Sequence, residues 1–168
     1  MRVAVTGTPG VGKTTATARV DSTLDVVNLN DLVRDEGLTS GTDVDRGSLI
    51  ADLDAVADRL AGRDDVLVES HLAHHLDADR VIVLRCRPDA LESRLLERGE
   101  SAEKAAENAE AEALDVILSE AVDRHGLDSV YEIDTTDRSP ESVAESIEAV
   151  LLDEREPSAG TVDFTGYL

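Results

Sequence analysis

The sequence predicts an α/β fold in which a five-stranded parallel sheet carries helices on both faces. Three observations support this prediction. Strand-like and helix-like segments alternate along the chain. The strand-like segments are continuous apolar runs, which are typical of strands buried on both sides of a parallel sheet. A glycine-rich loop that ends in a lysine joins the first strand to the first helix.

The first two strands and helices follow from the pattern near the amino terminus. Residues 2–6 (RVAVT) form the first expected strand, and a helix over 12–20 follows the glycine-rich loop. Residues 25–29 form the second strand. Asn30 is expected to cap a helix over 31–36, because its side chain can accept a hydrogen bond from the first helical turn.

The middle of the chain is expected to hold a loop, a helix and two strands. Residues 37–41 are bounded by glycines and form the loop. A helix is expected over 43–60 because apolar residues recur there at spacings of four, three and four: Leu49, Leu53, Val56 and Leu60. The apolar runs at 65–69 and 80–85 are the third and fourth strands.

The carboxyl-terminal part is expected to hold three helices and the last strand. Pro88 opens a helix that ends near Gly99, with proline in the first turn and glycine past the end. Ser101 starts a long helix, whose expected apolar face is Ala106, Ala109, Ala113, Val116 and Ile117. The fifth strand is 130–134. Residues 139–140 (Ser-Pro) begin the last helix, with an inward face of Val143, Ile147, Val150 and Leu151.

The chain has 168 residues, a length that suits one domain with one core. We expect a single domain over residues 1–154. A flexible acidic tail is expected over 155–168, which contains a proline and two glycines and shows no apolar period. Hydrophobic residues make up 41% of the chain but aromatic residues only 2%, so aliphatic side chains and alanine must build the core.

Three features indicate a soluble cytoplasmic protein. No run of 18 apolar residues is present, so no membrane span is expected, and the amino terminus lacks the shape of a signal peptide. Cys86 is the only cysteine, which excludes an internal disulfide and agrees with a reducing compartment. We expect Cys86 to be a small buried residue at the end of a strand.

Strong acidity is the unusual feature of the composition. The net charge is −21, from 37 acidic and 16 basic residues, and only two of the basic residues are lysines. An acidic surface repels nucleic-acid phosphates, so direct sequence-specific binding of a nucleic acid is not expected. Two explanations remain, adaptation to a cytoplasm of high salt and binding of a basic protein partner. We favour salt adaptation because the acidic residues are spread over the whole chain.

Residues 7–14, GTPGVGKT, match the phosphate-loop motif G-x-x-x-x-G-K-[ST] at every fixed position. The strand expected before it and the helix expected after it are the context that this motif requires. Its glycines let the backbone wrap a phosphate, Lys13 bridges the β- and γ-phosphates of ATP, and the Thr14 hydroxyl holds Mg²⁺. Thr15 can donate a further hydrogen bond to a phosphate. The sequence therefore predicts a P-loop NTPase.

The loop by itself does not say what is done with ATP. No asparagine is followed by lysine, which disfavours the guanine-binding Asn-Lys-x-Asp of regulatory GTPases, and motor or transporter ATPases need a longer chain. Small nucleotide and metabolite kinases fit this size. These enzymes close a mobile lid rich in arginine over the phosphates.

A second pattern follows the fourth strand and separates the P-loop families from one another. Together with residues 7–15, the sequence L-x-x-R-G at 95–99, Lys104, Asn108 and Glu112 resembles the nuclear-type adenylate kinase family and its archaeal members. These are small adenylate kinase/ATPases with a role in the maturation of small-subunit ribosomal RNA. The resemblance runs from the first residue to about residue 152, which is nearly the whole chain.

The resemblance implies a P-loop NTPase fold of the nucleoside monophosphate kinase type, and it assigns the ATP side of the site. ATP would bind to the residues of the loop and of the first helical turn: Gly10, Gly12, Lys13, Thr14 and Thr15. Arg98 would lie over the ATP phosphates as part of a lid over 98–108. Arg138, just after the fifth strand, would lie against the adenine.

The resemblance also places the second nucleotide and the acidic group. Residues 28–51 would form the AMP-binding region, with Arg34 on the AMP phosphate. Glu69 would support Mg²⁺ or its water, and His71 would take part in ATP hydrolysis. Glu69 stands where eukaryotic relatives commonly have aspartate.

Simpler explanations exist for several of these residues. Arg34 lies on an amphipathic helix and is also compatible with a solvated surface arginine. Arg98, near a helix carboxyl terminus, is compatible with a charge that complements the helix dipole. Three histidines, His71, His74 and His75, suggest a metal, but a single cysteine and the absence of a zinc-like spacing disfavour a structural metal site.

The expected activity is that of an adenylate kinase, ATP + AMP ⇌ two ADP with Mg²⁺, and ATPase activity is a second output. Lys13, Arg98, His71 and Glu69 are the expected catalytic residues. ATP and AMP are the expected partners, together with a basic small-subunit ribosomal protein. Two alternatives stay open: an ATP-driven ribosome assembly factor with little kinase turnover, and a small-molecule kinase with another acceptor.

Overall fold

The computed structural model describes residues 1–44 and 48–168, and its centre is a five-stranded parallel sheet. The strands are β1 (Arg2–Thr6), β2 (Asp25–Asn28), β5 (Val66–Glu69), β6 (Arg80–Arg85) and β7 (Val130–Asp134). Their order in the sheet is β2-β5-β1-β6-β7, and each neighbouring pair is parallel. The predicted fold class is therefore confirmed, and each predicted strand lies within one residue of its predicted place.

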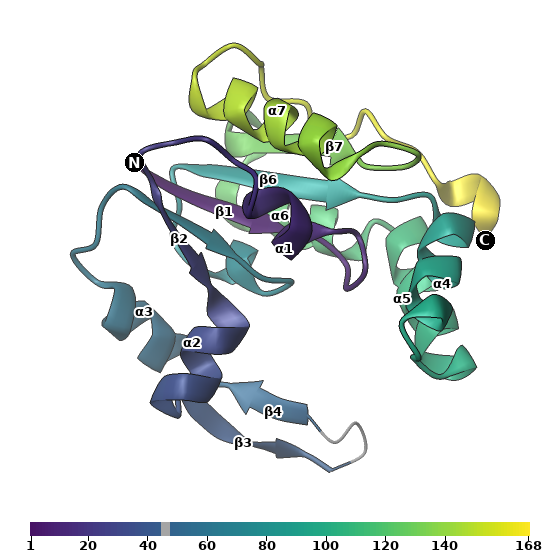
Figure 1. Ribbon diagram of the computed structural model, residues 1–168, viewed down its shortest axis with the longest axis horizontal. Helices are drawn as coiled ribbons and strands as arrows, with labels where there is room; N and C mark the ends of the chain where they lie inside the picture. Colours follow the sequence, from purple (N-terminus) through teal and green to yellow (C-terminus); the bar gives the residue numbers. More distant parts are fainter. Residues whose placement is uncertain (45–47) are drawn as a thin grey trace.

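Helices cover both faces of this sheet (Figure 1). One face carries α1 (Lys13–Thr17), α4 (Pro88–Glu97) and α7 (Pro140–Leu151). The other face carries α2 (Leu29–Glu36), α3 (Leu53–Leu60), α6 (Val116–His125) and the short 3₁₀ helix η1 (Ala73–His75). Successive residues of β1 divide between the two faces, since Val3 and Val5 join the first core cluster and Ala4 joins the second.

The expected helix over 43–60 is only partly correct. Residues of the expected loop and of the first part of this helix form an antiparallel hairpin of β3 (Thr39–Asp43) and β4 (Ser48–Ala51), which Figure 1 shows below the main sheet. Asp52 starts α3 instead, because its side chain accepts a hydrogen bond from Ala55 N. Leu49 matched the helical spacing but lies on β4 and is exposed. The expectation for residues 45–47 lies outside the described residues.

The long helix expected from Ser101 is two helices, α5 (Ala102–Ala113) and α6. The chain leaves the helical path at Asp115, which has a positive φ of 56°. Arg85 Nη2 donates hydrogen bonds to Glu112 O and to Asp115 Oδ1, and so holds the end of α5 in this conformation. The predicted apolar face shifts as well, because Ala105 is buried and Ala106 is exposed.

Helix capping is partly as predicted. Ser101 and Ser139 each accept a hydrogen bond of 3.2 Å from the backbone N–H three residues later, as N-caps do. The prediction that Asn30 caps α2 is wrong. Asn28 is the cap, and its Oδ1 accepts from Asp31 N at 2.9 Å. Helix α2 therefore begins at Leu29, and Asn30 lies within its first turn.

The expectation of a flexible tail differs from the structure, because residues 155–168 pack against the sheet edge. Ser158 N donates to Val130 O at 3.0 Å, which places the tail beside β7. Phe164 is buried, with its ring 5.4 Å from Arg85 Cζ. The tail ends in a short 3₁₀ helix, η3 (Thr165–Tyr167). A similar short helix, η2 (Leu127–Ser129), lies outside the tail and precedes β7. Phe164, packed against the buried Arg85, therefore anchors the tail, which its composition alone did not predict to be ordered.

Two further expectations concern Cys86 and membrane spans. Cys86 directly follows β6 and is buried, as predicted. In the described part of the chain, no helix has the length and apolar character needed to cross a membrane.

Candidate functional site

The glycine-rich loop joins β1 to α1 and turns tightly at two glycines. Gly10 has a φ of 96° and Gly12 a φ of 98°, and residues with a side chain rarely adopt these backbone angles. A Cβ added at Gly10 would also lie 2.8 Å from a methyl carbon of Leu95 on α4. A side chain at position 10 would therefore be strained by its backbone conformation and would push the Leu95 side chain aside, because the loop packs directly onto α4.

Lys13 is the first residue of α1 and its ammonium lies inside the loop. Nζ donates to Gly7 O at 2.8 Å and to Thr8 O at 3.2 Å, and the residue is buried. Burial lowers the pKa of Lys13 to about 8, while the carboxylates of Glu69 and Glu112 act in the opposite direction. The ammonium is thus a buried point charge held by two carbonyls, which an incoming polyanion can replace.

A hydroxyl and a carboxylate lie side by side next to this lysine. Thr14 Oγ1 donates to Glu69 Oε1 at 2.8 Å, and Asn28 Nδ2 donates to the same oxygen. Glu69 and Asn28 end the neighbouring strands β5 and β2 and are register partners. Sequence reasoning placed Asn28 at the start of the AMP-binding region but missed its contact with Glu69. Its position at the carboxyl end of a parallel strand was a signal for this contact, because ligands bind at this edge of α/β sheets.

These groups open into a pocket of about 310 Å³. Its lining brings together most of the residues predicted from the sequence, and it adds Pro9 and Asn30; the predicted ones are Gly10, Gly12, Lys13, Thr14, Thr15, Glu69, His71 and Arg98. Arg98 lies exposed at the end of α4, and its side chain makes no ion pair with the residues that the structure describes. Its charge is therefore available to a ligand in this pocket.

A second pocket, of about 330 Å³, adjoins the first and shares Asn30 and His71 with it. Helix α2 and strand β4 supply most of its lining: Leu29, Asn30, Val33, Arg34, Leu49, Ala51, His71 and Leu72. Arg34 is exposed and pairs with Asp31 at 2.8 Å and with Asp35 at 3.5 Å. The hydrogen bond that Arg34 donates to the Asp31 carboxylate raises the pKa of Arg34.

A third pocket, of about 140 Å³, lies on the opposite side of the loop and shares Gly12 and Thr15 with the first. The lining of this pocket is Val11, Gly12, Thr15, Ala16, Thr135, Arg138, Pro140 and Val143. Arg138 is fixed there, since it donates to Asp134 O at 3.2 Å and to Ser142 O at 2.7 Å. The loop pocket therefore lies between two others, and each of these holds one predicted arginine.

The sequence relationships agree with this geometry. The AAA domain family model matches residues 3–115. The chain is 69% identical over the full length of both proteins to "Putative adenylate kinase" of Natronomonas pharaonis. It is 43% identical to the protein of that name from Methanothermobacter thermautotrophicus, with 99% of this chain and 98% of that one covered.

The chain belongs to this archaeal adenylate kinase family. Its enzyme class is therefore that of the nucleoside monophosphate kinases. Solved structures of low identity show the same fold. A shikimate kinase from Bacteroides thetaiotaomicron has a TM-score of 0.52 at 13% identity, covering 90% of this chain and 98% of that one. A sulfotransferase from Alicyclobacillus acidocaldarius has a TM-score of 0.53 at 12% identity, covering 94% and 84%.

In this member of the adenylate kinase family, His71 lines the site, whereas His74 and His75 lie beside Glu120. Burial lowers the pKa of His71 to about 4, so this imidazole, which lines both the loop pocket and the second pocket, is neutral near pH 7. His74, His75 and Glu120 come close enough to hold a metal ion. His74 is already satisfied by protein groups, with Nδ1 at 2.8 Å from Thr6 Oγ1 and Nε2 at 2.8 Å from Glu120 Oε2.

The remaining residues of the adenylate kinase pattern divide into two groups. Lys104 pairs with Glu100 at 3.5 Å, and Asn108 Nδ2 donates to Lys104 O at 3.0 Å, so both make local contacts outside the loop pocket. Glu112 instead contacts the loop itself, because its Oε2 accepts from Thr8 Oγ1 at 2.6 Å. The sequence marked Glu112 as part of a pattern but gave no sign of this contact.

Proposed function

We propose that the protein is an adenylate kinase that catalyses ATP + AMP ⇌ two ADP. The observation that carries this proposal is the row of three adjoining pockets, with the phosphate loop in the middle one and an arginine in each outer one. Phosphoryl transfer between two nucleotides needs two base sites on either side of a shared phosphate site. A simple ATPase needs only one of the two outer pockets.

ATP takes the third and the first pockets in this proposal. Its adenine lies against Arg138, whose guanidinium is already held by α7, and its phosphates enter the loop, where Lys13 exchanges the carbonyls of Gly7 and Thr8 for phosphate oxygens. Thr15 and the glycines of the loop supply further contacts. Binding at the start of α1 is favoured because helix amino termini attract anions.

Mg²⁺ accompanies ATP, and the neighbouring oxygens of Thr14 and Glu69 suit it. Hard oxygen donors are the ligands that Mg²⁺ prefers, and one or two protein groups with phosphates and waters are its usual set. Thr14 Oγ1 and Glu69 Oε1 provide such donors 2.8 Å apart, directly or through water. When bound, the ion neutralises charge that develops on the phosphates.

AMP takes the second pocket. Its base lies among the apolar side chains of Val33, Leu49 and Leu72, and Arg34 exchanges its surface carboxylates for the AMP phosphate. The 28–51 region thus provides the acceptor site. His71 and Asn30 line both this pocket and the loop pocket, so they flank the path of the transferred group.

Transfer of the phosphoryl group requires the protein to align the two nucleotides and to compensate the charge that develops on the phosphates, and no covalent bond to the protein is needed. Lys13 and Arg98 hold the phosphoryl oxygens, and the 98–108 segment closes as a lid that excludes water. The neutral His71 can orient a water when AMP is absent, which provides the ATPase activity. Glu69 keeps Thr14 and the ion in place.

The cellular setting follows from charge and relatives. The net charge of −21 suits a cytoplasm of high salt, and relatives with 69% identity come from Natronomonas pharaonis and Halobacterium salinarum. The same acidic surface attracts basic proteins, and we infer that its partner is a basic small-subunit ribosomal protein. Binding of this partner would give the protein a role in ribosomal RNA maturation. Binding of such a partner is compatible with kinase turnover.

ADP formation measured at high salt, with and without AMP, tests the proposed function. The proposal predicts strong stimulation by AMP, weak ATP hydrolysis without it, and loss of both activities in Lys13→Ala. Turnover that ignores AMP but responds to a ribosomal protein would instead identify an ATP-driven assembly factor. Stimulation by a different acceptor in a screen of monophosphates and small metabolites would identify another kinase.

A further inference from the structure

A buried carboxylate on α5 contacts the phosphate loop. Glu112, near the end of α5, is 3% exposed, and its Oε2 accepts the hydrogen bond of 2.6 Å from the Thr8 hydroxyl. Thr8 is equally buried, and its carbonyl is one of the two that hold the Lys13 ammonium. A displacement of Thr8 therefore displaces a ligand of the lysine that binds phosphate.

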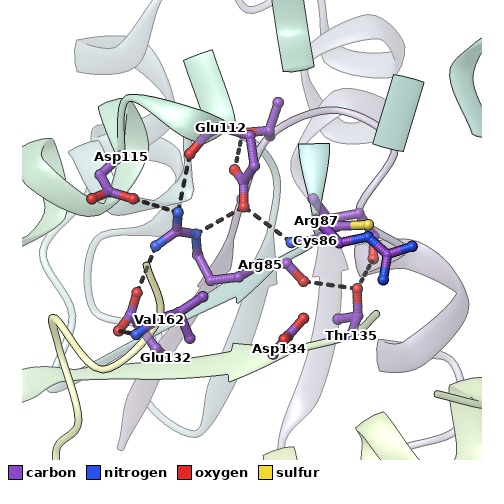
Figure 2. Close-up of polar contacts among 12 residues, drawn as sticks. Arg85, Cys86, Arg87, Glu112, Asp115, Glu132, Asp134, Thr135 and Val162 are labelled. Atoms are coloured by element: carbon purple, nitrogen blue, oxygen red, sulfur yellow. Dashed lines mark hydrogen bonds and ion pairs between the residues drawn. The ribbon is translucent and has the colours of Figure 1, made fainter. Parts of the chain in front are cut away.

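Arg85 fixes the position of the Glu112 carboxylate. Arg85 Nε donates to Glu112 Oε1 at 2.8 Å, and Cys86 N donates to the same oxygen at 3.0 Å. Figure 2 shows the guanidinium surrounded by Glu112, Asp115 and Glu132, with which it forms ion pairs of 2.8, 2.5 and 2.6 Å. With both oxygens bonded and the arginine anchored on three sides, the carboxylate has one available orientation.

The tail closes the far end of the same network. Glu132 uses Oε1 for Arg85 and Oε2 for the tail, accepting from Thr161 N at 2.7 Å and Val162 N at 3.1 Å. Phe164 then covers the guanidinium. A hydrogen-bonded path thus runs from the tail through β7, β6 and α5 to the loop, and its charges are shielded from water along the way.

We propose that Glu112 is a positioning residue for the phosphate loop and acts through the Thr8 hydroxyl. A loop held in its binding conformation loses less entropy when ATP enters, so the contact strengthens ATP binding without touching the nucleotide. Removing one partner from this buried network leaves a carboxylate oxygen without its donor, which favours a rearrangement of the loop. The inference rests on the proposed function only in taking ATP as the ligand of the loop.

Titration calorimetry of ATP with Mg²⁺ tests the inference on the full chain. Thr8→Val keeps the shape and the Arg85–Glu112 pair but removes the donor, and we expect it to raise the Kd for ATP about tenfold. Thr8→Ser restores the donor and is expected to bind ATP as the wild type does. Thr161→Val is the matched control, since its hydroxyl bonds Glu132 Oε2 at 3.2 Å at the far end of the network.

A double-mutant cycle separates positioning from general stability. Glu112→Gln and Thr8→Val both alter the hydrogen bond between Thr8 and Glu112, and the proposal says that Glu112 reaches the loop through this bond. The double variant is therefore expected to have a Kd for ATP no higher than that of the more affected single variant. Additive losses, an unchanged Kd in Thr8→Val, or an equal loss in Thr161→Val would overturn the inference. Absence of AMP-stimulated turnover in the wild type would refute the proposed function alone, because the Kd comparison does not depend on turnover.

Discussion

The Thr14 hydroxyl donates a hydrogen bond of 2.8 Å to Glu69 Oε1, which joins the first turn of α1 to the carboxyl end of β5. Asn28 Nδ2, at the end of the neighbouring strand β2, donates to the same oxygen. Three separate segments therefore converge on one carboxylate beside the phosphate loop. This convergence places Glu69 where it can orient the hydroxyl that the loop motif assigns to Mg²⁺.

Neutralising Glu69 should weaken the binding of Mg²⁺ at the site. Glu69→Gln keeps the size of the side chain but removes its charge, so we expect the Mg²⁺ concentration for half-maximal activity to rise about tenfold or more. Glu141→Gln is a matched control, because this exposed carboxylate pairs with Arg19 and lines none of the three pockets. An unchanged Mg²⁺ dependence in Glu69→Gln would show that the carboxylate has no part in holding the ion.

Removing Arg34 should affect AMP and spare ATP. The side chain lines the second pocket and shares no pocket with the loop, so Arg34→Ala is expected to raise the KM for AMP about 10- to 100-fold with the KM for ATP unchanged. The comparison variant is Arg59→Ala, whose arginine pairs with Glu36 on the surface. If both variants keep the wild-type KM for AMP, Arg34 is a surface arginine and the acceptor phosphate lies elsewhere.

Arg98 is expected to act on the rate of transfer. Its guanidinium lines the loop pocket and has no ion pair within the described residues, and compensation of developing charge is worth most in the transition state. Arg98→Ala should lower kcat about 100-fold in steady-state assays. Arg87→Ala, which removes a surface arginine paired with Asp89 at the other end of α4, should not. A similar small effect of both would favour a helix-dipole role for Arg98.

Affinity for ATP should fall as the pH rises above about 8. Burial lowers the pKa of Lys13 to about 8 in the free protein, so the ammonium loses its proton above that pH, and bound phosphates favour the charged form. The protein must then take up a proton when ATP binds, since the phosphates themselves are already ionised there. Calorimetry at pH 8.5 in buffers of different ionisation heat measures this uptake. A binding heat that is independent of the buffer would contradict it.

Strands were predictable because each is a short run with apolar residues between turn residues, and the parallel sheet buries all of them except the edge strand β2. The hairpin β3–β4 was not, because Leu49 falls by chance at a helical spacing from Leu53, and nothing local shows that Asp52 interrupts the pattern. The break between α5 and α6 was missed for another reason. It depends on Arg85, a residue 30 positions away from Asp115 in the chain.

In the candidate site, too, contacts between residues close in the sequence were predictable and contacts between distant residues were not. Residues 7–15 are close in sequence, so a motif with a fixed spacing predicted their meeting. Asn28 and Asn30 reach the site only through the order of the strands, in which β2 lies beside β5. The contact of Glu112 with Thr8 depends on how α5 packs on the loop, and no spacing within the sequence encodes it.

A crystal structure with a dinucleotide inhibitor, in which two adenosines are joined through a phosphate chain, would show directly whether the protein holds two nucleotides at once. We expect one adenosine to lie against Arg138, the phosphates to fill the loop at Lys13, and the other adenosine to occupy the pocket of Arg34. Density for a single nucleotide in the loop, with the Arg34 pocket empty at saturating inhibitor, would contradict the claim that this protein transfers phosphate between two nucleotides.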